Sequence, residues 1–186
     1  MRALLLVFVA FPAIAGGATL RDISVDHVDG AYIMRSEVWF DVGIERIYGL
    51  LLDWDQSPKF SSVIAESRNL EPGPDGRARY YSRTEGCLWF FCKSFERYGY
   101  VEHEPLRYIE ATADPAQSDF EVSDERWEFR EEADGTVVTY AFRMKPKFFI
   151  PPLIGPAILK AKLRNGGANA IERIEKLARD YAPYAD

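Results

Sequence analysis

The sequence predicts an α+β domain in which a curved antiparallel sheet packs against one long C-terminal helix. Strand-like segments follow one another from about residue 65 to residue 145 without a helix between them, and such runs pair antiparallel. From about Leu153 to Tyr181, apolar residues recur every three or four positions, as they do along one face of a helix. A long helix across a curved sheet can enclose a hollow, so we expect a site for an apolar ligand.

The chain is expected to begin with a hairpin followed by two helices. We expect, in order, a strand at 21–28, a turn at Asp29-Gly30, a strand at 31–42 and helices at 44–54 and 57–63. Aspartate followed by glycine is a strong hairpin signal, and residues 31–42 alternate between apolar and polar side chains. Pro58 is tolerated because it falls in the first turn of its helix.

Six further strands are expected before the long helix. They are placed at 65–70, 77–85, 91–102, 107–113, 122–131 and 136–145. Turn-forming residues at Gly73–Gly76, Glu104-Pro105 and Asp134-Gly135 mark reversals between them. The inward face of each strand stays open at this point, because a one-residue slip in register exchanges the two faces.

The C-terminal helix is amphipathic but contains two adjacent glycines. The residues expected to face the sheet are Ile154, Ile158, Ala161, Ala168, Ile171, Ile174, Ala178 and Tyr181. Gly166 and Gly167 each cost about 1 kcal/mol relative to alanine in a helix interior. Either a ligand or a strand approaches the backbone there, or the helix bends.

The first 18 residues have the features of a secretory signal peptide. Arg2 supplies a positive charge, residues 3–11 are unbroken apolar, and Pro12 ends that run. Small residues allow cleavage after Ala15 or after Ala18. The apolar run is shorter than the roughly 20 residues of a membrane-spanning helix, although a retained anchor or a buried N-terminal segment is the alternative.

The predicted export and the composition limit which functions this protein can have. We expect residues 19–186 to form a single exported domain, periplasmic if the source is Gram-negative and otherwise secreted. The formal net charge is −6, with 23 basic and 29 acidic residues and no cluster of lysine and arginine. Such a chain is a poor nucleic-acid binder and is not suited to simple electrostatic docking on anionic lipid. We expect a monomer.

Cys87 and Cys92 are read first as a disulfide, because a pair of cysteines in an exported protein is usually structural. On one straight strand, residues five apart lie about 17 Å apart and point to opposite faces, whereas a disulfide needs Cα atoms within about 7 Å. The bond therefore requires a hairpin whose tip is Leu88–Phe91. Two free thiols or a redox pair are the alternatives.

Four local sequences carry a family resemblance. They are Ser36–Asp41, Ile47–Asp53, Pro58–Glu71, and Trp127–Phe129 followed by Gly135–Tyr140. In this order they resemble the START-like (SRPBCC) superfamily, which includes polyketide cyclases, coenzyme-Q-binding proteins and lipid-transfer domains. The resemblance covers nearly all of the mature chain. It implies a helix-grip fold, in which the sheet wraps around the C-terminal helix and encloses a hydrophobic cavity. The signal peptide and the cysteine pair are additions to the commonest pattern and disfavour cytosolic polyketide tailoring.

Few residues suggest a metal site or nucleophilic catalysis. His27 and His103 both lie near turns and belong to no set with metal-ligand spacing, and we read them as surface residues. The sequence has no Gly-x-Ser-x-Gly motif and no phosphate loop. We therefore expect no metal and no cofactor, and we assign no catalytic residue.

Charged residues within strands are the remaining candidates for acid–base chemistry. They are Glu37, Arg83, Glu85, Arg97 and Glu110. A charge that points into an apolar cavity must be paired or shifted in pKa, and it could then orient a ligand or transfer a proton. The alternative is that these charges line the solvent face, and the opposite parity of Glu37 and Val38 favours it.

Aromatic residues crowd the predicted sheet, and they are either ligand contacts or packed core. Two apolar turns, at Leu88–Phe91 and Phe148–Ile154, stand out because turns are normally polar. We expect both to flank the cavity mouth and to touch a membrane or donor protein; folding back onto the core is the alternative. The candidate ligand contacts, in the cavity or at its mouth, are Trp89, Phe91, Phe95, Tyr108, Trp127, Tyr140, Phe149, Ile158 and Gly166.

The sequence thus favours an exported binding or carrier protein for a hydrophobic small molecule such as a lipid, a quinone or a polyketide-like ring. The alternative is a cyclase- or dehydratase-type enzyme that uses a buried carboxylate or tyrosine in the same cavity. A third possibility is a domain filled by its own aromatics that binds a protein partner. A paired, buried ionisable group in the cavity favours the enzyme, and a wholly apolar cavity favours binding alone.

Overall fold

The computed structural model describes residues 17–88, 91–150 and 155–185. Most of the predicted signal peptide and the predicted ligand contact Trp89 lie outside the described residues. No helix within the described residues is long and apolar enough to cross a membrane.

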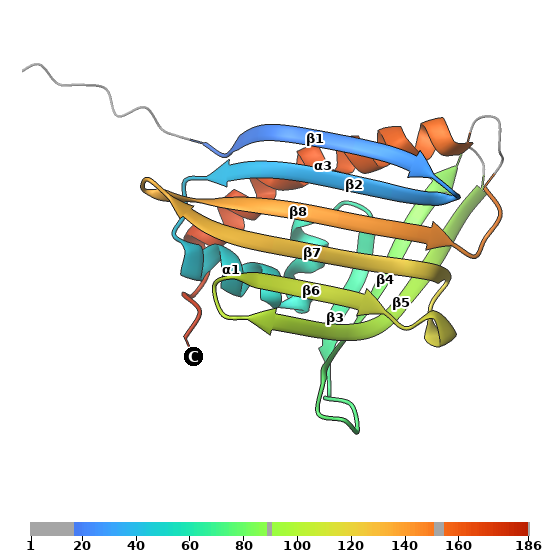
Figure 1. The fold of residues 1–186 in the computed structure, drawn as a ribbon, viewed down its shortest axis with the longest axis horizontal. Helices are drawn as coiled ribbons and strands as arrows, with labels where there is room; N and C mark the ends of the chain where they lie inside the picture. The colour runs from blue at the N-terminus through green and yellow to red at the C-terminus, as the bar shows by residue number, and fades with distance from the viewer. Residues whose placement is uncertain (1–16, 89–90, 151–154, 186) are drawn as a thin grey trace, which may run out of the picture.

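In the described residues, eight strands form one antiparallel sheet in the order β1-β2-β8-β7-β6-β5-β4-β3 (Figure 1). The strands are β1 (Thr19–Val28), β2 (Ala31–Phe40), β3 (Ile64–Leu70), β4 (Ala78–Leu88), β5 (Phe91–Glu104), β6 (Tyr108–Ala113), β7 (Phe120–Glu132) and β8 (Gly135–Pro146). The predicted turn at Asp29 and Gly30 is confirmed, and both residues adopt positive φ there.

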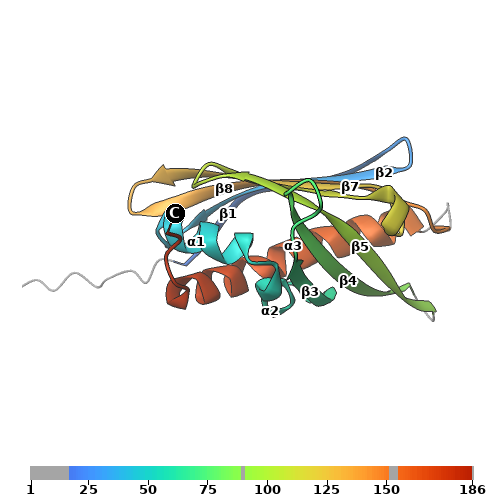
Figure 2. The same ribbon diagram turned by 90° about the horizontal axis from the view of Figure 1, so that it is seen from below.

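The helices all lie on one side of the sheet or at its edge. They are α1 (Ile44–Leu52), the short 3₁₀ turns η1 (Trp54–Gln56) and η2 (Pro115–Gln117), α2 (Ser57–Phe60) and the long α3 (Gly155–Asp180). Figure 2 shows α3 running beneath the sheet beside α1 and α2, while β3, β4 and β5 bend toward the same side. The face of the sheet that looks toward α3 is called the concave face below.

The core lies between this concave face and the helices. The apolar face of α1 buries Ile47, Tyr48 and Leu50 completely, and α3 adds Ile171 and Ala178 near its C-terminus. A smaller cluster of Tyr32, Phe120 and Met144 lies toward the other end of the sheet. The start of α3 packs against that smaller cluster, so the helix meets core residues at both of its ends.

The second predicted helix is shorter than expected. The structure ends it at Phe60 rather than at Val63. The backbone is extended from Ser61 onward, and the carbonyl of Val63 already accepts a hydrogen bond from the Glu85 N–H. Pairing with β4 therefore replaces the last helical turn.

The predicted register of α3 is wrong in its first half. Ile158 and Ala161 are exposed, and Leu159 and Leu163 pack against the smaller cluster instead. Gly167 lies against the inner face of β1 and β2, where Ile23 and Met34 approach the helix backbone. The close approach at Gly167 brings Leu163, one turn earlier, onto the face that packs inward in place of Ala161.

Candidate ligand site on the concave face

Alternation along the central strands places a buried polar group on the concave face. Arg97 of β5, Glu125 of β7 and Tyr140 of β8 have the same inward parity as the fully buried Ile109 of β6. Strands β5 and β7 are separated only by β6, whose inward residues toward Arg97 are Ala111, opposite Glu125, and Ala113. Because both alanines are small, the long side chains of Arg97 and Glu125 can meet over β6.

The guanidinium of Arg97 is the centre of a hydrogen-bond network. Its Nη1 donates to Glu125 Oε1 at 3.0 Å and to Ser123 Oγ at 3.2 Å. Its Nε donates to Ser82 Oγ at 3.0 Å. The hydroxyl of Tyr140 donates to the second oxygen of Glu125 at 2.9 Å. The side chains of Arg97 and Glu125 are each 7% exposed, so this ion pair is withdrawn from solvent.

Burial and charge set the protonation of this network. Burial disfavours the charged form of Arg97, but the adjacent Glu125 carboxylate more than compensates, and the pKa of Arg97 is raised. Burial raises the pKa of Tyr140 well above its ordinary value, and the negative charge of Glu125 adds to the effect. The pKa of Tyr80 is also raised, mainly by burial. Both phenols therefore stay protonated at physiological pH, and the Tyr140 hydroxyl donates to Glu125.

Aromatic rings surround the polar network. Tyr80 stacks on Trp54 with a centroid distance of 4.0 Å, and Trp54 meets Trp127 edge-on at 6.1 Å. Trp127 in turn lies 5.0 Å from Tyr140, and Tyr140 lies 6.3 Å from Phe142. The concave face thus presents a continuous aromatic wall with one charged pair set into it. Such a surface suits a mostly apolar molecule that carries a polar group.

Several inward rings on this wall are only partly buried although α3 covers the same face. Trp127, Tyr140, Phe142 and Phe95 all keep some accessible surface. A Cβ atom added at Gly166 of α3 would meet no atom within 4 Å. Open space therefore lies beside Gly166 in the middle of α3.

A shallow pocket opens at the end of the molecule where α3 begins. Its volume is about 260 Å³, and its lining includes His27, Tyr32, Pro146, Phe148, Ile150 and Pro156. Phe148 stacks on Phe95 with a centroid distance of 3.9 Å. Phe142 lies in the same apolar cluster, and the Arg97 guanidinium carbon is 5.9 Å from its ring centre. Packed apolar side chains thus connect the lining of the pocket with the buried ion pair.

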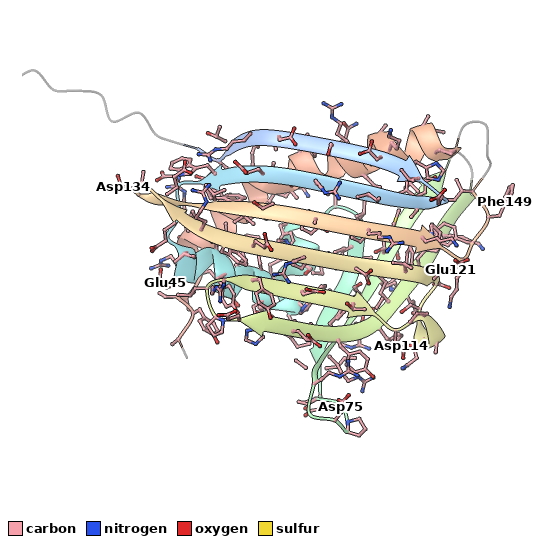
Figure 3. The ribbon with its side chains drawn as sticks, in the orientation of Figure 1. Glu45, Asp75, Asp114, Glu121, Asp134 and Phe149 are labelled. Carbon is pink, nitrogen blue, oxygen red and sulfur yellow. The ribbon has the colours of Figure 1, made fainter. Side chains whose placement is uncertain are left out.

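The structure divides the predicted ligand contacts. Trp127, Tyr140 and Phe95 lie on the concave face, and Phe149 lies next to Phe148 of the pocket lining, at the end where the pocket opens. Phe149 is 81% exposed and projects away from the body of the molecule (Figure 3). Ile158 is exposed on α3 and does not face the sheet. Phe91 lies at the start of β5, opposite Leu88, and its side chain is outside the described part.

Tyr108 lies on the face of the sheet that points away from α3, whereas a cavity contact would have to lie on the concave face. In the ladder it pairs with Glu128, and its ring carries the guanidinium of Arg126 at 4.2 Å. Both of those residues have outward parity, because Trp127 between them faces inward. The prediction of Tyr108 as a cavity residue is therefore wrong, and the cause is the one-residue ambiguity of strand faces.

The charged residues considered for acid–base chemistry also lie on different faces of the sheet. Glu37, Arg83, Glu85 and Glu110 form ion pairs on the solvent side, with Arg21, with Glu66 and each other, and with Arg126. Only Arg97 turns inward. Its partners Glu125, Ser82 and Ser123 were missed by the sequence reasoning. Ser123 and Glu125 have the same parity along the strand as the apolar Trp127 and Phe129. This shared parity was the sequence signal that both face inward.

Both histidines are exposed, as the sequence predicted. His27 stacks on Tyr32 at 4.4 Å, and His103 Nδ1 is 2.6 Å from the hydroxyl of Tyr48. No group of three metal-ligating side chains occurs among residues 17–88, 91–150 and 155–185. The backbone register places Cys87 directly opposite Cys92 across a hairpin, so the chain reversal that a disulfide requires is confirmed.

Solved structures of other proteins share this arrangement of sheet and helices. The STAR-related lipid transfer protein from Xanthomonas axonopodis superposes with a TM-score of 0.64 at 16% identity, over 88% of this chain and 99% of the other. A START superfamily protein from Mycobacterium smegmatis gives a TM-score of 0.61 at 20% identity, over 78% and 98%. The domain has the START-like helix-grip fold.

A second kind of protein shares the same fold. The di-domain ARO/CYC StfQ from the steffimycin biosynthetic pathway superposes with a TM-score of 0.62 at 13% identity, over 82% of this chain and 52% of StfQ. No family profile matches the sequence of this chain, and no curated protein matches it either. The likeness to the solved structures therefore establishes the fold, and function must be argued from the site itself.

Proposed function

We propose that this protein binds a hydrophobic small molecule between the concave face of its sheet and α3, and acts as a carrier outside the cytoplasm. The observation that carries the proposal is the Arg97–Glu125 pair set into a wall of partly accessible aromatic rings. Burial of apolar ligand surface contributes about 25 cal/mol per Å², which would draw a poorly soluble molecule from water into the site. The buried pair would fix the orientation of its polar group.

Two kinds of structural neighbour supply ligand classes for this proposal. The neighbour from Xanthomonas axonopodis is named as a lipid transfer protein, and StfQ is named as an ARO/CYC of a biosynthetic pathway. A lipid, a quinone and a polyketide-like ring all combine a large apolar surface with oxygen atoms. Each is therefore a candidate ligand for the aromatic wall and its polar network.

The buried ionisable pair is the feature that also raises the enzyme alternative. A cyclase or dehydratase would need a group that takes or gives a proton near the ligand. Both oxygens of Glu125 already accept hydrogen bonds, from Arg97 and from Tyr140. Proton transfer to Glu125 would have to break one of them, and the raised pKa of Tyr140 makes its phenol a weak acid. The arrangement supports orientation of a ligand more than acid–base turnover.

Export is part of the proposal, and one contact favours the first of the two cleavage positions. The backbone N–H of Ala18 donates to the carboxylate of Glu175, which is buried in α3, and Ala18 packs against the core. Cleavage after Ala18 would remove this residue, whereas cleavage after Ala15 would keep it. We therefore propose Gly16 as the mature N-terminus, with a disulfide between Cys87 and Cys92. The intact mass of protein exported by a bacterial host tests both statements.

We further propose that the protein loads and releases its ligand at a membrane through the end of the molecule that carries Phe149. The exposed Phe149 side chain and the apolar pocket beside it are next to the start of α3. Exposed apolar groups of this kind are typical of surfaces that contact membranes or partners. A displacement of the first turns of α3 would open a path toward Arg97.

Native mass spectrometry of the exported protein, followed by organic extraction, tests the binding function directly. We expect a bound apolar molecule of defined mass, which is lost in an Arg97→Met variant that still folds. Recovery of only the unliganded mass, together with no uptake from a total lipid extract, would contradict the proposal. Turnover of the bound molecule into a second mass on incubation would instead support the enzyme alternative.

A further inference from the structure

Donor groups on the concave face outnumber the acceptors available to them. Trp54 Nε1 and the hydroxyl of Tyr80 are buried and have no hydrogen-bond partner among the described residues. Arg97 uses Nε and Nη1 for all of its hydrogen bonds to described residues, which leaves Nη2 without one. Buried polar groups in folded proteins are almost always paired, so the two buried unpaired donors, Trp54 Nε1 and the Tyr80 hydroxyl, need an explanation.

The acceptors of the same region are already in use. Glu125 accepts from Arg97 with one oxygen and from Tyr140 with the other. The hydroxyl oxygens of Ser82 and Ser123 both accept from Arg97. The protein therefore offers mainly hydrogen-bond donors to a ligand. The complementary group on the ligand is a hydrogen-bond acceptor.

The three donors are close enough to act on one ligand. Trp54 and Tyr80 are a stacked pair with centroids 4.0 Å apart, and the Arg97 guanidinium carbon lies 5.9 Å from the Tyr80 ring centre. Tyr80 is completely buried and Trp54 is 3% exposed, so bulk water does not satisfy them. Burial also raises the pKa of Tyr80, which keeps its phenol protonated and able to donate.

We infer that the ligand of this site carries a carbonyl-type oxygen, as in a ketone, quinone or ester, and that Tyr80, Trp54 and Arg97 recognise it. The inference rests on the proposed binding function and narrows its ligand class. A carbonyl oxygen accepts hydrogen bonds and donates none, which matches the surplus of donors. A hydrocarbon would leave the donors unpaired, and an alcohol would add one more donor to the region.

The unpaired Tyr80 hydroxyl should not contribute to the stability of the ligand-free protein. In Tyr80→Phe an unpaired buried hydroxyl is removed while the stacked ring is kept, so the melting temperature should stay the same or rise. Tyr81→Phe is the matched control on the same strand and the opposite face, since its hydroxyl donates to Glu96 at 3.0 Å. A melting temperature several degrees lower in Tyr80→Phe than in Tyr81→Phe would mean that the Tyr80 hydroxyl has a partner within the protein, and the inference would fall.

The ligand class itself is tested with three probes that share one ring system. Isothermal titration calorimetry compares 2-acetylnaphthalene, 2-ethylnaphthalene and 1-(2-naphthyl)ethanol, which differ only in the group attached to the ring. We expect the ketone to bind at least about tenfold more tightly than the hydrocarbon, with the alcohol between them. In Tyr80→Phe and in Trp54→Phe this preference should shrink to about threefold or less, whereas Tyr81→Phe should keep it.

The outcomes separate the inference from the function on which it rests. Equal binding of the ketone and the hydrocarbon by the parent protein would overturn the carbonyl inference and leave hydrophobic binding intact. An unchanged preference in both Tyr80→Phe and Trp54→Phe would overturn the assignment of these donors. Failure to bind all three probes, together with an unliganded native mass, would overturn the proposed function and this inference with it.

Discussion

At the scale of single residues, Arg97 shows how the fold handles a charge in an apolar setting. Withdrawing a guanidinium from water is costly, and the cost is offset only if the charge is paired and its donors are satisfied. Ser82 of β4 and Ser123 and Glu125 of β7 supply that pairing. The network can form only when the sheet is assembled, so it links tertiary structure to the electrostatics of the site.

Removing one member of this pair should destabilise the protein more than removing both. We expect Arg97→Leu to lower the free energy of unfolding by about 3–5 kcal/mol, because Glu125 is left buried without its counter-charge. The double variant Arg97→Leu/Glu125→Leu should lose less than Arg97→Leu alone. Urea denaturation of the parent, both single variants and the double variant measures this coupling. Simple addition of the two single effects would show that the two side chains do not interact.

At the scale of elements, α3 meets its neighbours differently at its two adjacent glycines. A Cβ atom on Gly166 would meet nothing, whereas one on Gly167 would lie 3.3 Å from Ile23 Cδ1 and 3.4 Å from Met34 Cε. The two glycines that interrupt the helix are therefore not equivalent. Gly167 permits the close approach of α3 to β1 and β2, and Gly166 borders open space.

Alanine substitutions should separate the two glycines. Gly166→Ala should raise the free energy of unfolding by about 1 kcal/mol, since alanine is the better helix former and the site is open. Gly167→Ala has the same gain in helix propensity, but Ile23 and Met34 must move by a few tenths of an ångström, so its net gain should be smaller or absent. Thermal unfolding of the two variants gives the comparison, and an equal gain in both would contradict the close approach at Gly167.

Asp53, which directly follows α1, connects this segment to the C-terminal end of α3 by hydrogen bonds. This carboxylate accepts hydrogen bonds from Tyr181, Gln56, Asn69 and the Asp55 backbone N–H. Burial pushes the pKa of Asp53 upward, but these hydrogen bonds outweigh burial, and the pKa lies below its ordinary value. The tail beyond α3 is therefore held to the body of the domain by an ionised group.

The contribution of Asp53 to stability should depend on pH in a defined direction. A carboxyl group with a lowered pKa in the folded state stabilises the protein above its unfolded-state pKa of about 3.9, and this stabilisation is lost as the pH falls through the folded-state value. The difference in unfolding free energy between the parent and Asp53→Asn should hence be constant from about pH 7 to pH 5 and shrink below about pH 4. Asp134→Asn, in the exposed β7–β8 turn, is the control. A difference that persists at about pH 2 would contradict the role of the ionised group.

At the scale of the whole molecule, the two ends of the domain have different characters. The end that contains the last turns of α3 is closed by Tyr181, Tyr184 and α1, which pack into the main core. The opposite end carries the pocket, the exposed Phe149 and the start of α3 (Figure 3). We propose ligand exchange at this apolar end, because the packed apolar side chains that lead to Arg97 begin there.

Loss of the exposed aromatic ring should affect membrane association without affecting folding. We expect Phe149→Ser to weaken binding to vesicles of phosphatidylethanolamine and phosphatidylglycerol several-fold and to leave the melting temperature nearly unchanged. Val63→Ser is the matched control, because Val63 is also an exposed apolar residue but lies beside β3. Vesicle flotation measures the association. Equal flotation of Phe149→Ser and the parent protein would contradict membrane contact at this end.

Much of the fold followed from local patterns. The strand run with its turn signals, the Asp29-Gly30 hairpin and the long C-terminal helix all depend on neighbouring residues, and each is present in the structure. The reversal between Cys87 and Cys92 was likewise deducible from disulfide geometry and strand spacing. Local propensity and periodicity act over a few residues, so the sequence by itself determined the elements, their order and the α+β class.

Only the tertiary structure decided which faces meet. Tyr108 and Arg97 both lie in strands rich in aromatics, yet one faces solvent and the other the core, because register fixes parity across the whole sheet. The rotation of α3 depends on Ile23 and Met34, more than 130 residues earlier in the chain. The Arg97–Glu125 pair and the unpaired donors of Tyr80 and Trp54 likewise join distant segments. These contacts are non-local, and no pattern of adjacent residues specifies them.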